Sequence, residues 1–190
     1  MSDLLLATRN AHKLREFGRL LAPRGVAALP DDVELPPEEG QSFAANALPK
    51  ARTAAHATGR IAIADDSGVE AAALGGAPGV YSARFAGPNA SDEENLEKLL
   101  REAPAGSALA YVCVVAYVDP DTGEERCFEG CCTGRLAEVP RGAGGFGYDP
   151  AFVPDDGDGT RTMAELSDAE KDAISHRGRA ARELLAWLER

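Results

Sequence analysis

The chain has 190 residues, and 44% of them are hydrophobic, which is enough to bury the core of one domain or of two closely packed lobes. Its 20 basic and 31 acidic residues give a net charge of −11, which disfavours wholesale binding to nucleic acid or to an anionic membrane. No apolar run reaches the ~20 residues of a membrane span, and the one near the amino terminus is too short for a signal peptide. We therefore expect a cytoplasmic protein with no nucleic-acid or membrane partner.

Strands and helices alternate in the first half of the chain, which indicates an α/β fold. The expected elements are a strand at 4–8, a helix at 10–23, an acidic loop at 31–40, a helix at 42–59 and a strand at 61–64. Asn10 and Ser42 are expected to cap the two helices, and Gly59 to end the second. Pro49 lacks an amide hydrogen, so it should kink the second helix or delay its start.

The second half contains long strands. The expected elements are a helix at 91–103, strands at 108–119 and 124–139 around the turn DPDTG, and two helical pieces that meet near Ser175. Ser91 and Glu94 form a capping-box pattern at the start of the first of these helices. The four cysteines contain no CxxC pair, and we expect small buried side chains rather than disulfides or zinc ligands: Cys113, Cys127, Cys131 and Cys132.

Two of the expected helices carry cations where the helix dipole disfavours them. Acidic side chains are favoured in the first turn of a helix by ~0.3 to 1 kcal/mol each, and cations are favoured in the last turn. Lys13 follows the cap Asn10, and His176 with Arg177 follows Ser175. Either these are solvated surface charges, or an anion or an electron-rich oxygen is bound at the helix start.

The sequence ADDSG places two carboxylates at the end of the apolar run 61–64. Adjacent side chains on a continuing strand point to opposite faces, so Asp65 and Asp66 can serve one ion together only if the chain turns there. Gly68 would permit such a turn, and an Asx turn is the simpler alternative. Carboxylates of this turn and of the acidic loop, together with phosphates, would suit Mg²⁺.

The sequence GAGGFGYDP, at 142–150, packs four glycines, two aromatic residues and an aspartate into a short segment. In one interpretation it is a tight bend with Phe146 and Tyr148 in the core. In the other it is a site for a flat ring, with Phe146 as a stacking face and Asp149 at the ring edge.

Four motifs in this order, ATRNAHK, ADDSGVEAAALGGAPGVYSAR, GGFGYDPAF and AEKDAISHR, resemble the inosine triphosphate pyrophosphatase family, also called dITP/XTP or non-canonical purine nucleoside triphosphate pyrophosphatases. The similarity runs from residue 4 to residue 188. It implies a homodimeric, Mg²⁺-dependent α/β protein in which residues 1–190 form one domain, with a long mixed sheet and two lobes that enclose a cleft. It also implies hydrolysis of purine triphosphates such as ITP, dITP and XTP to the monophosphate and pyrophosphate.

The resemblance also implies roles for individual residues. Asp66 would be the proton acceptor for the attacking water and, with Glu38, a ligand of Mg²⁺. The substrate would be bound by residues of the four motifs: Thr8, Arg9, Asn10, Ala11, His12, Lys13, Ser67, Phe146, Gly147, Tyr148, Asp149, Lys171, His176 and Arg177. Two residues depart from the common pattern, because Arg9 replaces a frequent glycine and Ala45 a frequent acidic residue. The second departure leaves Glu39 as an alternative to Glu38.

Two other functions fit parts of the sequence. One is a pyrophosphatase of other modified nucleotides, such as pyrimidines, and the other is a nucleotide-binding module without activity. The net charge argues against an RNA-binding module, since such a module should present a basic face.

Overall fold

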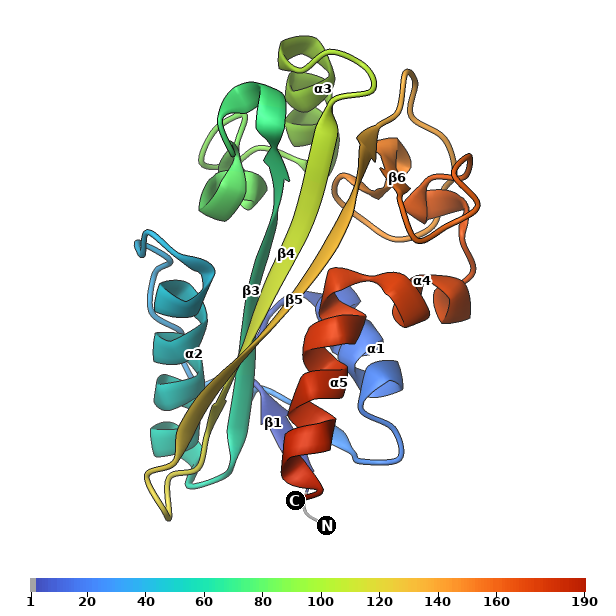
Figure 1. The fold of residues 1–190 in the computed structure, drawn as a ribbon. Helices are drawn as coiled ribbons and strands as arrows, with labels where there is room; N and C mark the ends of the chain where they lie inside the picture. The colour runs from blue at the N-terminus through green and yellow to red at the C-terminus, as the bar shows by residue number, and fades with distance from the viewer. Residues whose placement is uncertain (1–2) are drawn as a thin grey trace. The chain divides into compact units, whose positions relative to one another are not determined.

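The structure is a computed structural model that describes residues 3–190 (Figure 1). Its strands are β1 (Leu4–Leu6), β2 (Val26–Ala28), β3 (Ala62–Ala71), β4 (Ala108–Val118), β5 (Glu125–Leu136) and β6 (Phe152–Pro154). Its α-helices are α1 (Ala11–Leu20), α2 (Phe43–Thr58), α3 (Asp92–Glu102), α4 (Asp168–Ile174) and α5 (His176–Leu188). Within residues 3–190, none of the helices combines the length and the apolar character that a membrane crossing requires.

The six strands form one sheet in the order β2-β1-β3-β4-β5-β6. Strand β1 pairs in parallel with β2 and with β3, whereas β5 and β6 pair antiparallel. The sheet is therefore mixed, which confirms the expected α/β class with a mixed sheet.

The contacts divide the chain into two compact units. The first unit consists of the chain up to Asp66 with residues 113–130 and 179–190, and the second of residues 67–112 and 131–178. In the first unit, α2 covers one face of the strands, and α1 with α5 covers the other (Figure 1). The core between the strands and the second pair of helices contains Leu4, Leu6, Phe17, Leu21, Ile63, Cys113, Val115, Tyr117, Ala180, Ala181 and Leu184.

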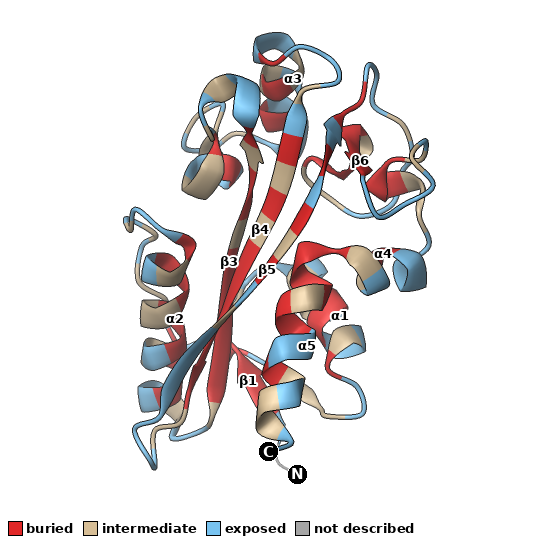
Figure 2. Cartoon of the chain, viewed as in Figure 1, coloured by how far each residue is buried: buried red, intermediate tan, exposed pale blue. Residues whose placement is uncertain are grey.

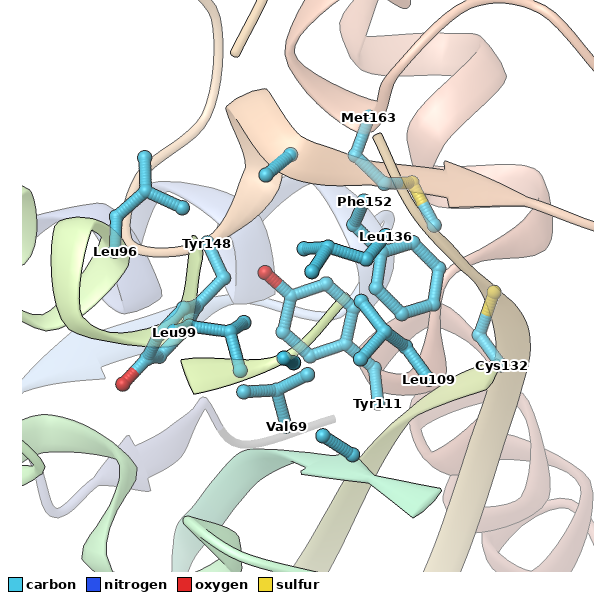
Figure 3. Packing of buried hydrophobic residues seen from close by; sticks show 13 residues of the cluster. Val69, Leu96, Leu99, Leu109, Tyr111, Cys132, Leu136, Tyr148, Phe152 and Met163 are labelled. Atoms are coloured by element: carbon cyan, nitrogen blue, oxygen red, sulfur yellow. The ribbon is translucent and has the colours of Figure 1, made fainter. Parts of the chain in front are cut away.

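The second unit has its own hydrophobic core, drawn in Figure 3. The rings of Tyr111 and Phe152 stack there with their centroids 4.4 Å apart. Tyr148 and Met163 join the same cluster, although both lie in segments between the long strands and the last helices. The segment GAGGFGYDP is therefore anchored in this core by the Tyr148 side chain.

Several boundaries follow the predicted caps. Asn10 caps α1, Ser42 caps α2, and Gly59 ends α2 in the left-handed conformation with φ +63°. Pro49 lies inside α2 without delaying its start, which remains at Phe43, so that alternative was wrong. The capping box of Ser91 and Glu94 is present at the start of α3.

Other expectations were wrong. Strand β3 does not end at the two aspartates but continues to Ala71, and most of its length is buried (Figure 2). The short strands β2 and β6 were not predicted. Cys113 and Cys132 are buried as expected, but Cys127 is exposed and Cys131 half-buried, because the first half of β5 is largely open to solvent (Figure 2).

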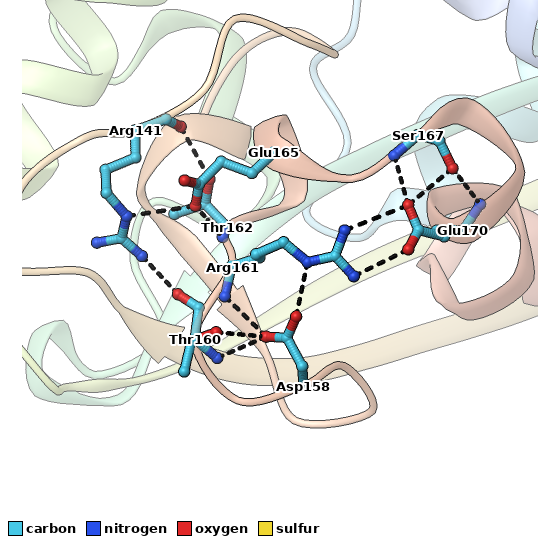
Figure 4. A network of polar contacts seen from close by, with 8 residues as sticks. All are labelled: Arg141, Asp158, Thr160, Arg161, Thr162, Glu165, Ser167 and Glu170. Carbon is cyan, nitrogen blue, oxygen red and sulfur yellow. Dashed lines mark hydrogen bonds and ion pairs between the residues drawn. The ribbon is translucent and has the colours of Figure 1, made fainter.

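An exposed polar network precedes α4 in the second unit (Figure 4). The Arg161 guanidinium bonds to Asp158 at 2.6 Å and to Glu170 at 2.8 Å. The Glu170 carboxylate also accepts the backbone N–H of Ser167, which caps α4. The network therefore fixes the start of the short helix that carries Lys171.

Candidate active site

The segment after β1 begins the first helix and is capped by its own side chains. The Thr8 hydroxyl accepts the backbone N–H of Asn10 at 3.1 Å. The Asn10 side-chain oxygen accepts the N–H groups of His12, at 2.8 Å, and Lys13, at 3.3 Å. A phosphate at this helix start would compete with Asn10 for the amides, but it could also use the positive end of the dipole.

Lys13 has a protein partner that explains its position in the first turn of α1. Its ammonium pairs at 2.9 Å with the carboxylate of Asp65, whose side chain is fully buried. The thiol of Cys113 lies 3.9 Å from the same carboxylate oxygen. Lys13 is therefore not a solvated surface charge, and the anion at this helix start is an aspartate of β3.

Asp66 points to the opposite face of β3. Its Oδ2 accepts a hydrogen bond of 2.8 Å from the amide of Asn46 on α2, whose own oxygen accepts the N–H of Gly40 at 2.7 Å. Burial raises the pKa of Asp66 above its ordinary value, the bond from Asn46 opposes this, and the charge of Glu38 adds to it. Asn46 thus joins the catalytic candidate to the end of the acidic loop.

Glu38 is held in this region by Lys50, one turn after Asn46 on α2. The Lys50 ammonium lies 2.5 Å from Glu38 Oε1 and 2.6 Å from the backbone oxygen of Asp65. Glu39 is exposed. Of these two glutamates, Glu38 is therefore the one whose charge acts on Asp66.

The donor set around Glu38 and Asp66 fits a hard divalent cation. Both residues offer carboxylate oxygens, and their charges interact, since Glu38 raises the pKa of Asp66. Residues 3–190 contain no group of three or more His, Cys, Asp or Glu side chains arranged around one metal position. Mg²⁺ does not need such a group, because it commonly binds one or two carboxylates together with water and substrate phosphates.

Arg9 holds the segment that follows β2. Its guanidinium donates to the backbone oxygens of Leu29 at 3.0 Å, Pro30 at 2.7 Å and Val33 at 2.8 Å. The loop that carries Glu38 continues from Val33. Arg9 thus ties the helix start after β1 to the beginning of the acidic loop.

In the second unit, Asp149 is the centre of the segment GAGGFGYDP. Its buried carboxylate accepts from the Lys171 ammonium at 2.7 Å, the Tyr111 hydroxyl at 3.1 Å and the backbone N–H of Phe146 at 3.0 Å. Burial, and after it the charge of Asp149, raises the pKa of Tyr111 well above its ordinary value, so this hydroxyl stays protonated. A Cβ on Gly145 would lie 1.9 Å from the Asp149 carboxylate, so only glycine fits there.

Phe146 is close to two cations of the last helices. The Lys171 ammonium is 5.3 Å from its ring centroid, and the Arg177 guanidinium carbon is 5.5 Å from it. Arg177 is buried and donates to the Ser67 hydroxyl at 2.9 Å. His176 stacks on Tyr111, with centroids 4.5 Å apart and the planes 8° from parallel. These two residues are therefore partnered within the protein, as Lys13 is.

Tyr148 differs from the ring-site expectation. Its ring lies in the core of the second unit, and its hydroxyl donates to the backbone oxygen of Ser82 at 2.7 Å (Figure 3). The core interpretation is thus right for the Tyr148 side chain, and only its main chain could contact a bound ring. Gly147 has φ +64° and open space around it.

The sequence predicted most of the candidate residues of this site but not the residues that bond to them. Asn46, Lys50 and Tyr111 each bond to a candidate residue from a different element. From the sequence, Lys50 was only a candidate cation for binding phosphate, and its bond to Glu38 was not predicted. An asparagine four positions before a lysine, on an otherwise alanine-rich helix, was the available sequence signal for Asn46.

Comparison with known proteins gives one consistent result. A sequence profile of the Ham1 family matches residues 4–187. A protein named dITP/XTP pyrophosphatase from Mycolicibacterium paratuberculosis is 50% identical, over 100% of this chain and 97% of its own. A protein of the same name from Symbiobacterium thermophilum is 50% identical, over 98% of this chain and 93% of its own. A solved HAM1 protein from Coxiella burnetii is 40% identical, with a TM-score of 0.87, over 100% of this chain and 99% of its own.

Proposed function

The chain belongs to the Ham1 family, and on that premise we propose that it hydrolyses non-canonical purine nucleoside triphosphates, such as ITP, dITP and XTP, to the monophosphate and pyrophosphate. The observation that carries the proposal is the 50% identity, over the whole chain, to a protein named dITP/XTP pyrophosphatase. The chemistry of the two residue clusters supports it, because one suits phosphates and a cation and the other suits a flat ring.

The triphosphate would be bound in the first unit. The start of α1 offers Thr8, Asn10 and the ammonium of Lys13, which would exchange part of its pairing with Asp65 for a phosphate oxygen. Arg9, Ala11 and His12 belong to the same segment, and the bonds of Arg9 to the loop after β2 support a role in shaping it.

We propose Mg²⁺ as the cofactor, held by Glu38 and Asp66; it would neutralise charge on the phosphate chain and lower the pKa of the attacking water. Asp66 would accept a proton from that water as it attacks the α-phosphorus. Asn46 orients the Asp66 carboxylate for this step by holding Oδ2. The Lys50 ammonium fixes Glu38 and limits its repulsion with Asp66.

The purine would be bound in the second unit. The Phe146 ring offers a face, and the main chain of Gly147, Tyr148 and Asp149 surrounds the same segment. Inosine and xanthine carry a carbonyl at position 6 where adenine carries an amino group. The donors of His176 and Arg177 would pair with that carbonyl, and Lys171 and Ser67 hold the segment and Arg177 in place.

The proposal extends to a homodimer in the cytoplasm, acting on a small nucleotide and not on nucleic acid. The net charge of −11 supports the last point, since it repels a polyanion. The single domain of two lobes that the resemblance implies stays a prediction.

Pyrophosphate release tests the proposal. The purified protein is given ITP, XTP, dITP, GTP, ATP and CTP in turn, with and without Mg²⁺. We expect rapid release from ITP, XTP and dITP only with Mg²⁺, and little from ATP and CTP. A preference for modified pyrimidines would favour the other enzyme function, and tight binding without release would indicate a nucleotide-binding module.

A further inference from the structure

Asp92, in the acidic first turn of α3, also bonds to a distant part of the chain. Asp92, Glu93 and Glu94 all lie in this turn, as the helix dipole favours. Only the Asp92 carboxylate, through Oδ2, accepts the backbone N–H of Gly147, at 2.9 Å. The two residues are 55 positions apart in the sequence. The contact joins α3 to the segment that carries Phe146.

The rest of α3 holds a neighbouring loop in the same way. Asn95 accepts the N–H of Ala86 at 2.8 Å and donates to the backbone oxygen of Ala83 at 3.2 Å. Lys98 donates to the backbone oxygen of Phe85 at 2.7 Å. Asp92, Asn95 and Lys98 are spaced three residues apart, so they lie along one side of the helix.

The two loops that α3 holds are also bonded to each other. The Tyr148 hydroxyl, on the first loop, donates to the backbone oxygen of Ser82, on the second. Burial raises the pKa of Tyr148, and the charge of Asp92 adds a smaller effect in the same direction. The turn at Gly147 is therefore tied to α3 directly through Asp92 and to the neighbouring loop through Tyr148.

The turn itself needs this second attachment. The Asp149 carboxylate holds it from the buried side through the N–H of Phe146. Gly147, next to Phe146, has φ +64°, and no atom beyond its chain neighbours lies within 4 Å of the position that a Cβ would occupy. Glycine has more backbone freedom than other residues, so a hydrogen bond to its N–H is an effective restraint on this peptide.

We infer that Asp92 is a positioning residue for base selection, which fixes the Gly147 peptide and through it the Phe146 ring. The inference rests on the proposed function, because it assigns the base-binding role to this segment. In this role Asp92 acts through its hydrogen bond to Gly147.

The test compares three variants. Asp92→Ala removes the acceptor, Asp92→Asn keeps an oxygen acceptor, and Glu93→Ala removes a charge from the same helical turn as a matched control. For each, kcat/KM is measured for ITP and for ATP. An exposed hydrogen bond of this kind is worth about fivefold in an equilibrium, so we expect Asp92→Ala to lower the ITP/ATP ratio about fivefold. Asp92→Asn should stay close to wild type, and Glu93→Ala should leave the ratio unchanged.

Loss of stability alone would lower both activities by the same factor and leave the ratio intact, and that result would overturn the inference. So would an equal fall of the ratio in Glu93→Ala. Hydrogen exchange of the Gly147 amide gives a readout independent of turnover, and it should quicken in Asp92→Ala only. If wild type fails to hydrolyse ITP, the proposed function is wrong, whereas unchanged exchange at Gly147 in Asp92→Ala refutes the positioning role by itself.

Discussion

Asp65 and Asp66 are adjacent on β3, and their carboxylates serve opposite faces of the strand. Asp65 pairs with Lys13 of α1, and Asp66 accepts a bond from Asn46 of α2. The side-chain alternation of a strand requires this, and β3 continues through both residues without a turn. The pair is thus divided between positioning a cation and, in the proposed reaction, accepting a proton.

Asp66→Asn should abolish turnover without destabilising the protein. The amide can neither accept the proton nor bind Mg²⁺ as an anion, so we expect a loss in kcat of about 10²-fold or more. Because burial raises the pKa of Asp66, the stability that this group contributes is present at low pH and lost as pH rises through its folded pKa. The variant should therefore be at least as stable as wild type near neutral pH. Retention of more than about a tenth of the activity at saturating Mg²⁺ would show that the acceptor lies elsewhere.

Lys13→Ala is expected to impair both substrate binding and folding. The dipole argument alone would make Lys13 dispensable for folding, but its removal leaves the buried Asp65 carboxylate without this ion pair. We expect a loss of about 2 kcal/mol in the free energy of unfolding, below the full value for buried pairs because Lys13 is partly exposed. Adding Asp65→Asn to Lys13→Ala should recover part of that loss while KM stays high. If the double variant is no more stable than Lys13→Ala, the pair is not what stabilises this region.

The sequence predicted the elements and the candidate residues better than their connections. Caps such as Asn10, Ser42 and Ser91 act within a few residues of themselves, so the pattern was sufficient. The turn expected at Gly68 failed because glycine permits a turn without requiring one, and pairing within the sheet kept the strand extended. Bonds such as that of Asp92 to Gly147 join residues far apart in the chain, and no local pattern encodes them.

The cations in the first turns of helices are a second case in which the sequence identified residues but not their partners. The pattern marked Lys13, His176 and Arg177 as unusual, and the structure gives Lys13 an anionic partner, His176 a stacked ring and Arg177 a hydroxyl. The dipole rule identifies a charge that needs compensation, but it does not say whether a ligand or another part of the chain supplies it.

Arg9→Ala should remove the hydrogen bonds that connect the start of α1 to the acidic loop. Four backbone oxygens lose their donor, two of them partly buried, so we expect a loss of about 1 to 2 kcal/mol in stability. The Mg²⁺ concentration for half-maximal rate should rise, because the loop that carries Glu38 is less restrained. Arg126→Ala, at an exposed arginine of β5, is the control. An unchanged Mg²⁺ dependence in Arg9→Ala would confine Arg9 to a structural role.

Glu170→Gln should lower stability in a pH-dependent manner. The bond from Arg161, followed by those from Ser167, lowers the pKa of Glu170 to about 2. The stability from this group is therefore present above its ordinary pKa and is lost as pH falls toward about 2. The unfolding temperature of the variant should lie below that of wild type near neutral pH, and the difference should vanish in acid. Because the network is exposed, added salt should also shrink the difference. A difference that persists in acid would assign the effect to the cap of α4.

Arg177→Ala tests how the base is selected. Arg177 lies over Phe146 and bonds to Ser67, so in the proposed complex its guanidinium pairs with the carbonyl at position 6 of inosine. We expect kcat/KM for ITP to fall at least about 30-fold, on the order of 2 kcal/mol, while the poor activity on ATP changes little. Arg182→Ala, at an exposed arginine of the same helix, is the matched control and should leave both substrates unaffected. Equal proportional losses for ITP and ATP in Arg177→Ala would mean that Arg177 serves the phosphates, because both substrates share them.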